Sequence, residues 1–317
     1  MNEFNRIELG KQAKQYGFVR DTYEKVCRLS QVLSFIENDN FLSNTLALKG
    51  GTAINLMFFN LPRLSVDIDL DLVNNFPKEE IIKLKELITE KFYTFMNNQG
   101  YIYEERNSKN THALISSVFS YINTGGVKDK IKIEVNYILR EHILTPEKQV
   151  IKNNQGFSVS KILCINQIEI YGAKITALLS RAAARDLYDV NNMLKSKMFS
   201  EKDMELLRKC VIFYKSINSD EAFDSFDTSA IDKITFSKIK SDLFPVISSS
   251  EKKYDLSGTI AFVKEQLEKL LQMTPDEKEF VKRYFKKEYL PELLFDSKEI
   301  CDRLKSHPLV KWQYSKM

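Results

Sequence analysis

The most informative pattern in the chain begins with a short apolar run followed by two glycines. Residues 46–48 read Leu-Ala-Leu, as expected for a buried strand, and Gly50 and Gly51 follow closely. Glycine allows the backbone to turn sharply and to approach a ligand closely. Thr52 stands where a new helix would begin, and the free N–H groups at a helix start favour a phosphate. The apolar residues after it predict a short helix that ends near Pro62.

Three aspartates alternate with aliphatic residues on the next predicted strand. Residues 66–72 read Val-Asp-Ile-Asp-Leu-Asp-Leu, so Asp67, Asp69 and Asp71 share one face. Aspartate is a poor strand former, and acids two residues apart lie about 7 Å apart and repel each other. Such a row is kept where something positive compensates it, and carboxylates suit Mg²⁺ together with substrate phosphates. The turn and this strand therefore predict a site for a nucleotide and a metal ion. An edge strand with a solvated acidic face is the alternative.

Helical periodicity flanks this region on both sides. A short helix is expected over 5–18. A longer helix is expected to start with Asp21 as its N-cap, because Glu24 three residues later completes a capping-box pattern. Residues 77–99 predict a further helix, since proline suits a helix start and Gly100 ends the pattern.

Short strands around a turn are expected next. Residues 101–105 and 112–122 favour strands, and the polar, glycine-containing run 123–126 predicts the turn. A further strand is expected over 130–138, where apolar residues alternate with polar ones that include Glu134. If that strand lies beside the acidic strand, Glu134 becomes a third acid for phosphoryl transfer, which uses carboxylates to hold closely spaced ions. A solvated glutamate on a half-exposed strand is the alternative.

A second charged pattern lies in residues 168–194, which predict one or two helices. Lys174, Arg181, Arg185 and Asp189 are spaced so that they would share one face of a continuous helix. Lysine and arginine suit phosphate, and arginine can bind it in bidentate fashion. The alternative is a surface face on which Arg185 and Asp189 form an ordinary ion pair.

The C-terminal third predicts more helices. A loop through Gly258 is expected before an amphipathic helix over 260–271. Thr274 is the expected N-cap of the following helix, with Glu277 completing a capping box. Basic and aromatic residues interleave in 280–289, as they would in an RNA-binding segment or in a helix with a core stripe and a solvated basic face.

Composition narrows the class of protein. The 317 residues are 43% hydrophobic, which permits a sizeable core in one large domain or two domains, and the net charge of +4 permits a nucleic-acid partner without requiring one. No apolar run approaches the length of a membrane span, and the polar start lacks the apolar core of a signal peptide. We therefore expect a cytoplasmic protein with no membrane partner. Its four widely spaced cysteines show no metal-binding spacing, as expected for reduced thiols: Cys27, Cys164, Cys210 and Cys301.

Two sequence blocks resemble a known family. The first combines Lys49-Gly50-Gly51-Thr52 with Arg63-Leu64-Ser65-Val66-Asp67-Ile68-Asp69-Leu70, and it resembles the signature of the nucleotidyltransferase superfamily. The second runs from Tyr171-Gly172 through Lys174, Leu178 and Arg181 to Arg185-Asp186 and Asp189. Together the blocks resemble the AbiEii/AbiGii abortive-infection toxins, the toxins of type IV toxin–antitoxin pairs. One departure is Thr52 where serine is frequent, and it keeps the hydroxyl.

The resemblance implies a fold, a domain division and residue roles. The implied fold class is α/β (α+β), with a nucleotidyltransferase-like mixed sheet in residues 1–160 and a mainly helical C-terminal domain in residues 161–317. Metal binding is expected at Asp67, Asp69 and Glu134, and Lys174 is expected to contact nucleotide phosphates. Asp186 and Asp189 would complete the electrostatics of the pocket or fix Lys174 and Arg185. The implied catalytic residues are Asp67, Asp69, Glu134, Lys174, Asp186 and Asp189. The implied nucleotide-binding residues are Lys49, Gly50, Gly51, Thr52, Arg63, Ser65, Lys174, Arg181 and Arg185.

The expected reaction is transfer of NMP from an NTP, with release of pyrophosphate and with Mg²⁺ or Mn²⁺ as cofactor. The NTP would be GTP or a pyrimidine NTP. The expected acceptor is RNA, a tRNA 3′ end, and the outcome is growth arrest in phage defence, controlled by an antitoxin encoded nearby. Two alternatives remain open from the sequence. One is transfer to a small molecule such as an antibiotic, and the other is a toxin that binds GTP or RNA without catalysis.

Overall fold

The computed structural model describes residues 4–59, 61–73, 76–151, 157, 159 and 161–316, with the side chain of Lys78 left out. The chain forms two compact units. Unit 1 consists of Met1–Arg140, Pro146–Ile165 and Pro245–Lys252, and unit 2 consists of Glu141–Thr145, Asn166–Phe244 and Lys253–Met317. The chain therefore passes between the units five times. A boundary at residue 160 between separately folding domains stays a prediction.

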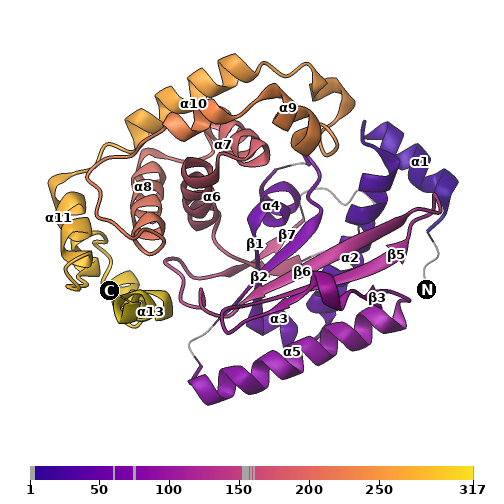
Figure 1. The fold of residues 1–317 in the computed structure, drawn as a ribbon, viewed down its shortest axis with the longest axis horizontal. Coiled ribbons are helices and arrows are strands. Elements are labelled where there is room, and N and C mark those ends of the chain that lie inside the picture. The colour runs from indigo at the N-terminus through magenta and orange to yellow at the C-terminus, as the bar shows by residue number, and fades with distance from the viewer. Residues whose placement is uncertain are drawn as a thin grey trace. The chain divides into compact units, whose positions relative to one another are not determined.

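Unit 1 is built on an eight-stranded mixed sheet in the order β3-β5-β6-β2-β1-β8-β7, with β4 paired to β5 (Figure 1). Two of its pairs are parallel, β2 with β6 and β1 with β8, and the others are antiparallel. This confirms the expected α/β class with a mixed sheet. The strands are β1 (Leu46–Lys49), β2 (Asp67–Leu72), β3 (Ile102–Tyr103), β4 (Lys109–Asn110), β5 (Leu114–Ile122), β6 (Lys128–Asn136), β7 (Glu147–Val150) and β8 (Lys161–Cys164).

Helices cover the apolar face of this sheet. Ile68 of β2 lies beside Ile133 of β6, and both are buried. Phe119 of β5 shares this face and contacts Tyr93 of α5, so α5 packs against it (Figure 1). The aliphatic half of the alternating pattern thus forms the core, and the acidic half is turned to the other face. The helices of unit 1 are α1 (Arg6–Gln15), α2 (Arg20–Asn38), α3 (Leu42–Thr45), α4 (Gly50–Ala53), a π-helical turn (Ile54–Phe58), α5 (Lys78–Asn98) and two 3₁₀ turns (Glu105–Asn107 and Ser249–Lys252).

The start of α2 differs from the sequence prediction. Val19 is the N-cap, and it makes no side-chain capping bond, so the predicted Asp21 cap is wrong. Glu24 is used elsewhere: it is buried and accepts hydrogen bonds from the main chain and the hydroxyl of Thr124, at 3.0 and 2.6 Å. Arg28 donates to the same carboxylate at 2.7 Å. The partner of Glu24 therefore lies in the 123–126 turn, which forms as predicted.

Residues 245–252 complete unit 1 from far along the chain. The Val246 carbonyl accepts a hydrogen bond from the Leu64 amide at 2.7 Å, and Ile247 forms a β-bridge with Arg63. The Ser249 amide donates to the Gly17 carbonyl at 2.8 Å. The loop that leads into β2 is thus held by a segment nearly two hundred residues downstream.

The regular secondary structure in the described residues of unit 2 is all helical. Its helices are α6 (Gln167–Arg181), α7 (Ala184–Ser196), α8 (Glu201–Ser216), α9 (Phe236–Lys238), a π-helical turn (Ile239–Leu243), α10 (Leu256–Leu270), α11 (Pro275–Tyr284), α12 (Lys298–Leu304) and α13 (Pro308–Lys316), with 3₁₀ turns at Ser229–Lys233 and Pro291–Leu293. The capping box of Thr274 and Glu277 on α11 forms as predicted. Helix α10 starts earlier than expected, because Asp255 caps it through the Gly258 amide.

The structure corrects one sequence prediction for unit 2 and decides between two interpretations of residues 280–289. The continuous helical face through residues 174–189 is wrong, because Ala182 adopts a left-handed conformation, φ 48°, and separates α6 from α7. In α11, Phe280 and Tyr284 are fully buried, so the aromatic residues form a core stripe. Arg283 on the same helix is bound by Glu279 at 2.6 Å.

In the part of the chain that the structure describes, no helix combines the length and apolar character needed to cross a membrane.

Candidate active site on the polar face of the sheet

Three predicted site acids lie side by side on the polar face of the unit 1 sheet. Asp69 of β2 pairs in register with Lys49 of β1 on one side and with Glu134 of β6 on the other. Asp67 lies one step along β2, directly opposite Lys132 of β6. Because residues directly opposite each other on neighbouring strands point to the same face, these five side chains form one charged patch. The prediction that Glu134 lies on a strand beside the acidic strand is confirmed.

The acids of this patch perturb one another. Burial raises the pKa of Asp69; Lys49 opposes the rise, and the charges of Glu134 and Asp67 add to it. Burial would also raise the pKa of Glu134, but the Lys132 ammonium and a hydrogen bond with a neighbouring serine lower it. Burial alone would lower the pKa of Lys132, yet the charges of Asp67 and Glu134 raise it. Carboxylates that share a site and shift each other's pKa are a common property of functional sites.

The glycine turn lies against the acid at the centre of the patch. Gly50 has φ +67°, a conformation that side chains rarely adopt, and a Cβ at this position would lie 2.6 Å from Asp69 Oδ2. A Cβ on Gly51 would lie 2.7 Å from a guanidinium nitrogen of Arg63 and 3.0 Å from the Ser65 hydroxyl. Glycine at both positions therefore lets the backbone approach the acid and the arginine, while contact of this turn with a phosphate stays a prediction.

Thr52 and Arg63 are placed to support this geometry. The helix begins at Gly50, two residues before the expected start, so Thr52 lies within its first turn. The Thr52 hydroxyl is buried and donates to the main-chain carbonyl of Asp67 at 2.5 Å. Arg63 is 2% exposed and donates to the Leu64 carbonyl at 2.9 Å. Direct phosphate contacts by Thr52, Arg63 and Ser65 stay predictions.

The charges of the patch leave room for a divalent cation. Four carboxylates lie on this face of β2 and β6, and Lys49 binds one of them, Asp71, at 2.5 Å. Lys132 is the second lysine among these acids, so the four carboxylates outnumber the two lysines by two. Oxygen-only ligands with that excess charge fit Mg²⁺ or Mn²⁺. In the described residues, no three acidic, histidine or cysteine side chains already converge as the ligands of an ion would.

Sequence reasoning passed over the role of Lys132. The alternation over 130–138 places Lys132 and Glu134 on one face, and this was the available signal. The ammonium lies 3.3 Å from Glu134 Oε2 and 3.9 Å from Asp67 Oδ2. Lys132 is therefore part of the charged patch, between two of the predicted metal ligands.

The residues of the second sequence block form a separate cluster within unit 2. Lys174 of α6 lies 3.0 Å from Asp186 Oδ1 and 3.3 Å from Asp189 Oδ2 of α7, and all three side chains are at least nine-tenths buried. Arg181 donates to Asp186 at 2.7 Å, although its own side chain is 66% exposed. Arg185 donates to the Asp242 carbonyl at 2.8 Å. Burial would raise the pKa of Asp186, but Lys174 and Arg181 lower it.

This cluster bears on the alternatives that the sequence left open. Asp186 and Asp189 bind Lys174 and thereby join the two helices that Ala182 separates. That arrangement matches the interpretation in which the aspartates fix the lysine. Contact between Lys174 and a nucleotide stays a prediction.

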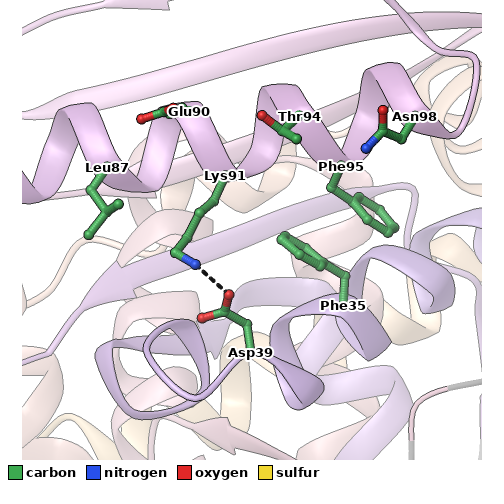
Figure 2. Close-up of a pocket in the computed structure, with 8 residues that line it drawn as sticks. All are labelled: Phe35, Asp39, Leu87, Glu90, Lys91, Thr94, Phe95 and Asn98. Carbon is green, nitrogen blue, oxygen red and sulfur yellow. Dashed lines mark hydrogen bonds and ion pairs between the residues drawn. The ribbon is translucent and has the colours of Figure 1, made fainter.

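A groove on unit 1 lies outside the charged patch. It has a volume of about 450 Å³ and is lined by α2 and α5, with Phe35 stacked on Phe95 at 4.2 Å between ring centroids and Lys91 bound to Asp39 at 2.6 Å (Figure 2). None of the predicted site residues lines it. Its helices belong to the apolar side of the sheet, so the groove does not serve the acids.

Comparisons with known proteins identify a family and a similar fold. The sequence model of a family described as nucleotidyl transferase AbiEii toxin, type IV TA system, matches residues 34–272, which include the charged patch and both sequence blocks. A structure with a similar fold is MenT4, a nucleotidyltransferase toxin from Mycobacterium tuberculosis H37Rv. It has a TM-score of 0.66 and 16% sequence identity, and the match covers 92% of this chain and 98% of that one. No curated protein sequence matches the chain.

The family match covers about three quarters of the chain and contains the glycine turn, the three acids and the lysine cluster. The chain therefore belongs to the AbiEii family of nucleotidyltransferase toxins, the toxin components of type IV toxin–antitoxin systems.

Proposed function

We propose that the charged patch of unit 1 transfers NMP from an NTP to an RNA acceptor, with a divalent cation held by Asp67, Asp69 and Glu134. The observation that carries this proposal is the parallel register of β2 and β6, which sets Asp69 beside Glu134 and places Asp67 on the same face. The excess of two carboxylates over lysines on this face matches the charge of one Mg²⁺ or Mn²⁺. When bound, such an ion would neutralise phosphate charge during the transfer.

The residues of the chain divide the remaining work. Gly51 and Thr52 open a helix, so their main-chain N–H groups are available to hold the phosphates of the NTP. Lys49 of β1 borders the acids and adds positive charge on the side of the glycine turn. The acceptor hydroxyl attacks the α-phosphorus and loses its proton to a carboxylate of the patch, while the bond to the β-phosphate breaks and pyrophosphate leaves.

The proposal also includes the nucleotide-binding residues that the family resemblance implies in unit 2. Lys174 is held by Asp186 and Asp189 and positions α6 against α7. Arg181 keeps two thirds of its side chain exposed and is the best candidate of this cluster for direct phosphate contact. Arg185 is proposed to support the same region through its bond to the Asp242 carbonyl.

The biological setting follows from the family and is part of the proposal. We infer that the acceptor is a tRNA 3′ end, that the NTP is GTP or a pyrimidine NTP, and that transfer arrests growth during phage infection. A cognate antitoxin encoded nearby would counter this activity in the cytoplasm. The net charge of +4 is compatible with an RNA acceptor.

The test is a labelling assay with the full chain. Purified protein is incubated with Mg²⁺, each α-³²P-labelled NTP in turn and total cellular RNA, and the RNA is separated by size. We expect label in a tRNA-sized band from one NTP, and we expect Asp69→Asn to abolish it. Asp129→Asn is the matched control, because Asp129 also lies on β6 but binds Lys25 on the other face.

The outcomes separate the candidate functions. Label that appears on a panel of antibiotics and never on RNA would make the acceptor a small molecule. NTP binding without transfer to either acceptor would leave a toxin that acts by sequestration. Full labelling and full growth arrest by Asp69→Asn would refute the role given to the charged patch.

A further inference from the structure

Lys132 has an unusual place among the acids of unit 1. It lies on β6 two residues before Glu134 and directly opposite Asp67 of β2, so all three side chains share one face. Its ammonium is 3.3 Å from Glu134 Oε2 and 3.9 Å from Asp67 Oδ2. A positive charge therefore lies between two of the carboxylates to which we assign the metal ion.

The other lysine of the patch is engaged differently. Lys49 is bound to Asp71, which is nearly fully buried and is not among the proposed metal ligands. On the β5 side, the neighbour of Lys132 is Val118, which carries no charge. The acids that act on Lys132 are Asp67, Glu134 and, more weakly, Asp69. Its charge is thus directed at the carboxylate site rather than at a partner elsewhere.

We propose that Lys132 is a built-in counter-cation that occupies the carboxylate site when no metal is bound and swings out when a divalent ion enters. This inference rests on the proposed function, because it takes Asp67, Asp69 and Glu134 as the ligands of the ion. A divalent ion held by these carboxylates and an ammonium within 4 Å of them would repel each other strongly. The two cations therefore compete for the same oxygens.

The side chain of Lys132 is suited to leave. A lysine ammonium is a point charge on a flexible four-carbon stem. The Lys132 side chain is 36% exposed, so its ammonium can reach solvent without a rearrangement of the sheet. In the metal-free protein the lysine limits the repulsion among the acids, and in exchange it weakens the apparent affinity for the metal.

The test measures metal binding without nucleotide or activity. The full chain is titrated with Mn²⁺, and free Mn²⁺ is followed by electron paramagnetic resonance. We expect Lys132→Met to bind Mn²⁺ about tenfold more tightly than the wild type, because no ammonium competes for the carboxylates. Lys132→Arg, which keeps the charge, should bind within about twofold of the wild type.

A matched control comes from the same strand. Lys130 shares the face of Lys132 two residues away, and the acid on which it acts is Glu104. Lys130→Met removes the same charge from the same face and should leave Mn²⁺ affinity within about twofold of the wild type. Thermal melts give a second readout: Lys132→Met should melt below the wild type without metal and gain more from Mn²⁺.

The outcomes decide the inference separately from the proposed function. Unchanged or weaker Mn²⁺ binding by Lys132→Met, with normal binding by the wild type, would overturn the inference alone. Binding by neither protein would overturn both this inference and the metal-dependent function. Equal tightening by Lys130→Met would show a general charge effect and would also overturn it. If Lys132→Met does not fold, Lys132→Gln keeps a polar group against the acids and carries the same expectation.

Discussion

The cluster around Lys174 allows a prediction that separates a structural role from direct nucleotide contact. The perturbation is Lys174→Met, which keeps the length of the side chain and removes its charge. The ammonium lies 3.0 Å from Asp186 and 3.3 Å from Asp189, and both carboxylates are almost fully buried. Removing one partner of a buried ion pair typically costs about 3–5 kcal/mol, because a charge is left buried without its counter-charge.

The structure sets the expected magnitude near the lower end of that range. Arg181 also donates to Asp186 at 2.7 Å, so Asp186 keeps one counter-charge when the lysine is removed. We expect Lys174→Met to destabilise the protein by about 3 kcal/mol. For a unit of this size, that corresponds to a fall in the melting temperature of about 6–12 °C.

The assay is a thermal melt followed by circular dichroism, with a double variant and a control. Lys174→Met combined with Asp189→Asn should recover part of the loss, because the second change removes the buried negative charge that Lys174 bound. Lys202→Met removes an exposed lysine of α8 and should leave the melting temperature unchanged. A Lys174→Met protein that has the melting temperature of the wild type but does not bind NTP would refute the structural role. It would support direct contact between Lys174 and a phosphate instead.

Three further predictions concern other parts of the structure. Gly50→Ala should lower the free energy of unfolding, measured in urea, by about 2 kcal/mol, because a left-handed alanine is strained and its Cβ would displace Asp69; an unchanged urea midpoint would contradict this. Stability contributed by Asp186 is present above its ordinary pKa of 3.8 and is lost as the pH falls toward its lowered pKa in the folded protein. Urea midpoints measured from about pH 6 to about pH 3 should therefore fall less steeply for Asp186→Asn, and parallel curves would argue against the shift. Glu24→Gln should lower the melting temperature through a loss of about 3 kcal/mol, since it leaves Arg28 without its buried counter-charge, and a melt like that of the wild type would be inconsistent with this.

The elements of the site that could be predicted are those with a local signal. Strict alternation over 66–72 decides which face of β2 is acidic, because a strand has a period of two. Adjacent glycines before a new helix likewise predicted a tight turn, although only the fold shows that this turn lies against Asp69. Alternation over 130–138 put Glu134 on a polar face, although only the fold shows which strand lies beside it.

The features that could not be predicted depend on contacts far apart in the sequence. Glu24 has the spacing of a capping-box residue, but its strongest partners are Arg28 and the distant Thr124, so tertiary contacts override the local pattern. Ala182 ends α6 in a left-handed conformation that alanine rarely adopts. No glycine or proline stands between residues 174 and 189 to indicate that the helix ends there. For Lys174, the family resemblance implied two possible roles of Asp186 and Asp189, and only the packing of α7 against α6 shows that both carboxylates bind the lysine.

The assignment of residues 245–252 to unit 1 has a consequence for synthesis of the toxin on the ribosome. Unit 1 contains the charged patch, but the loop before β2 is held by Val246 and Ile247, which are made only after α6 to α9. At about 5–20 residues per second, residues 166–252 take about 4–17 s to synthesise. Throughout that interval the nascent chain carries the acids of β2 without the segment that binds the loop before that strand. A fragment that ends at residue 165 is therefore an incomplete unit, and the toxin becomes whole only late in its own translation.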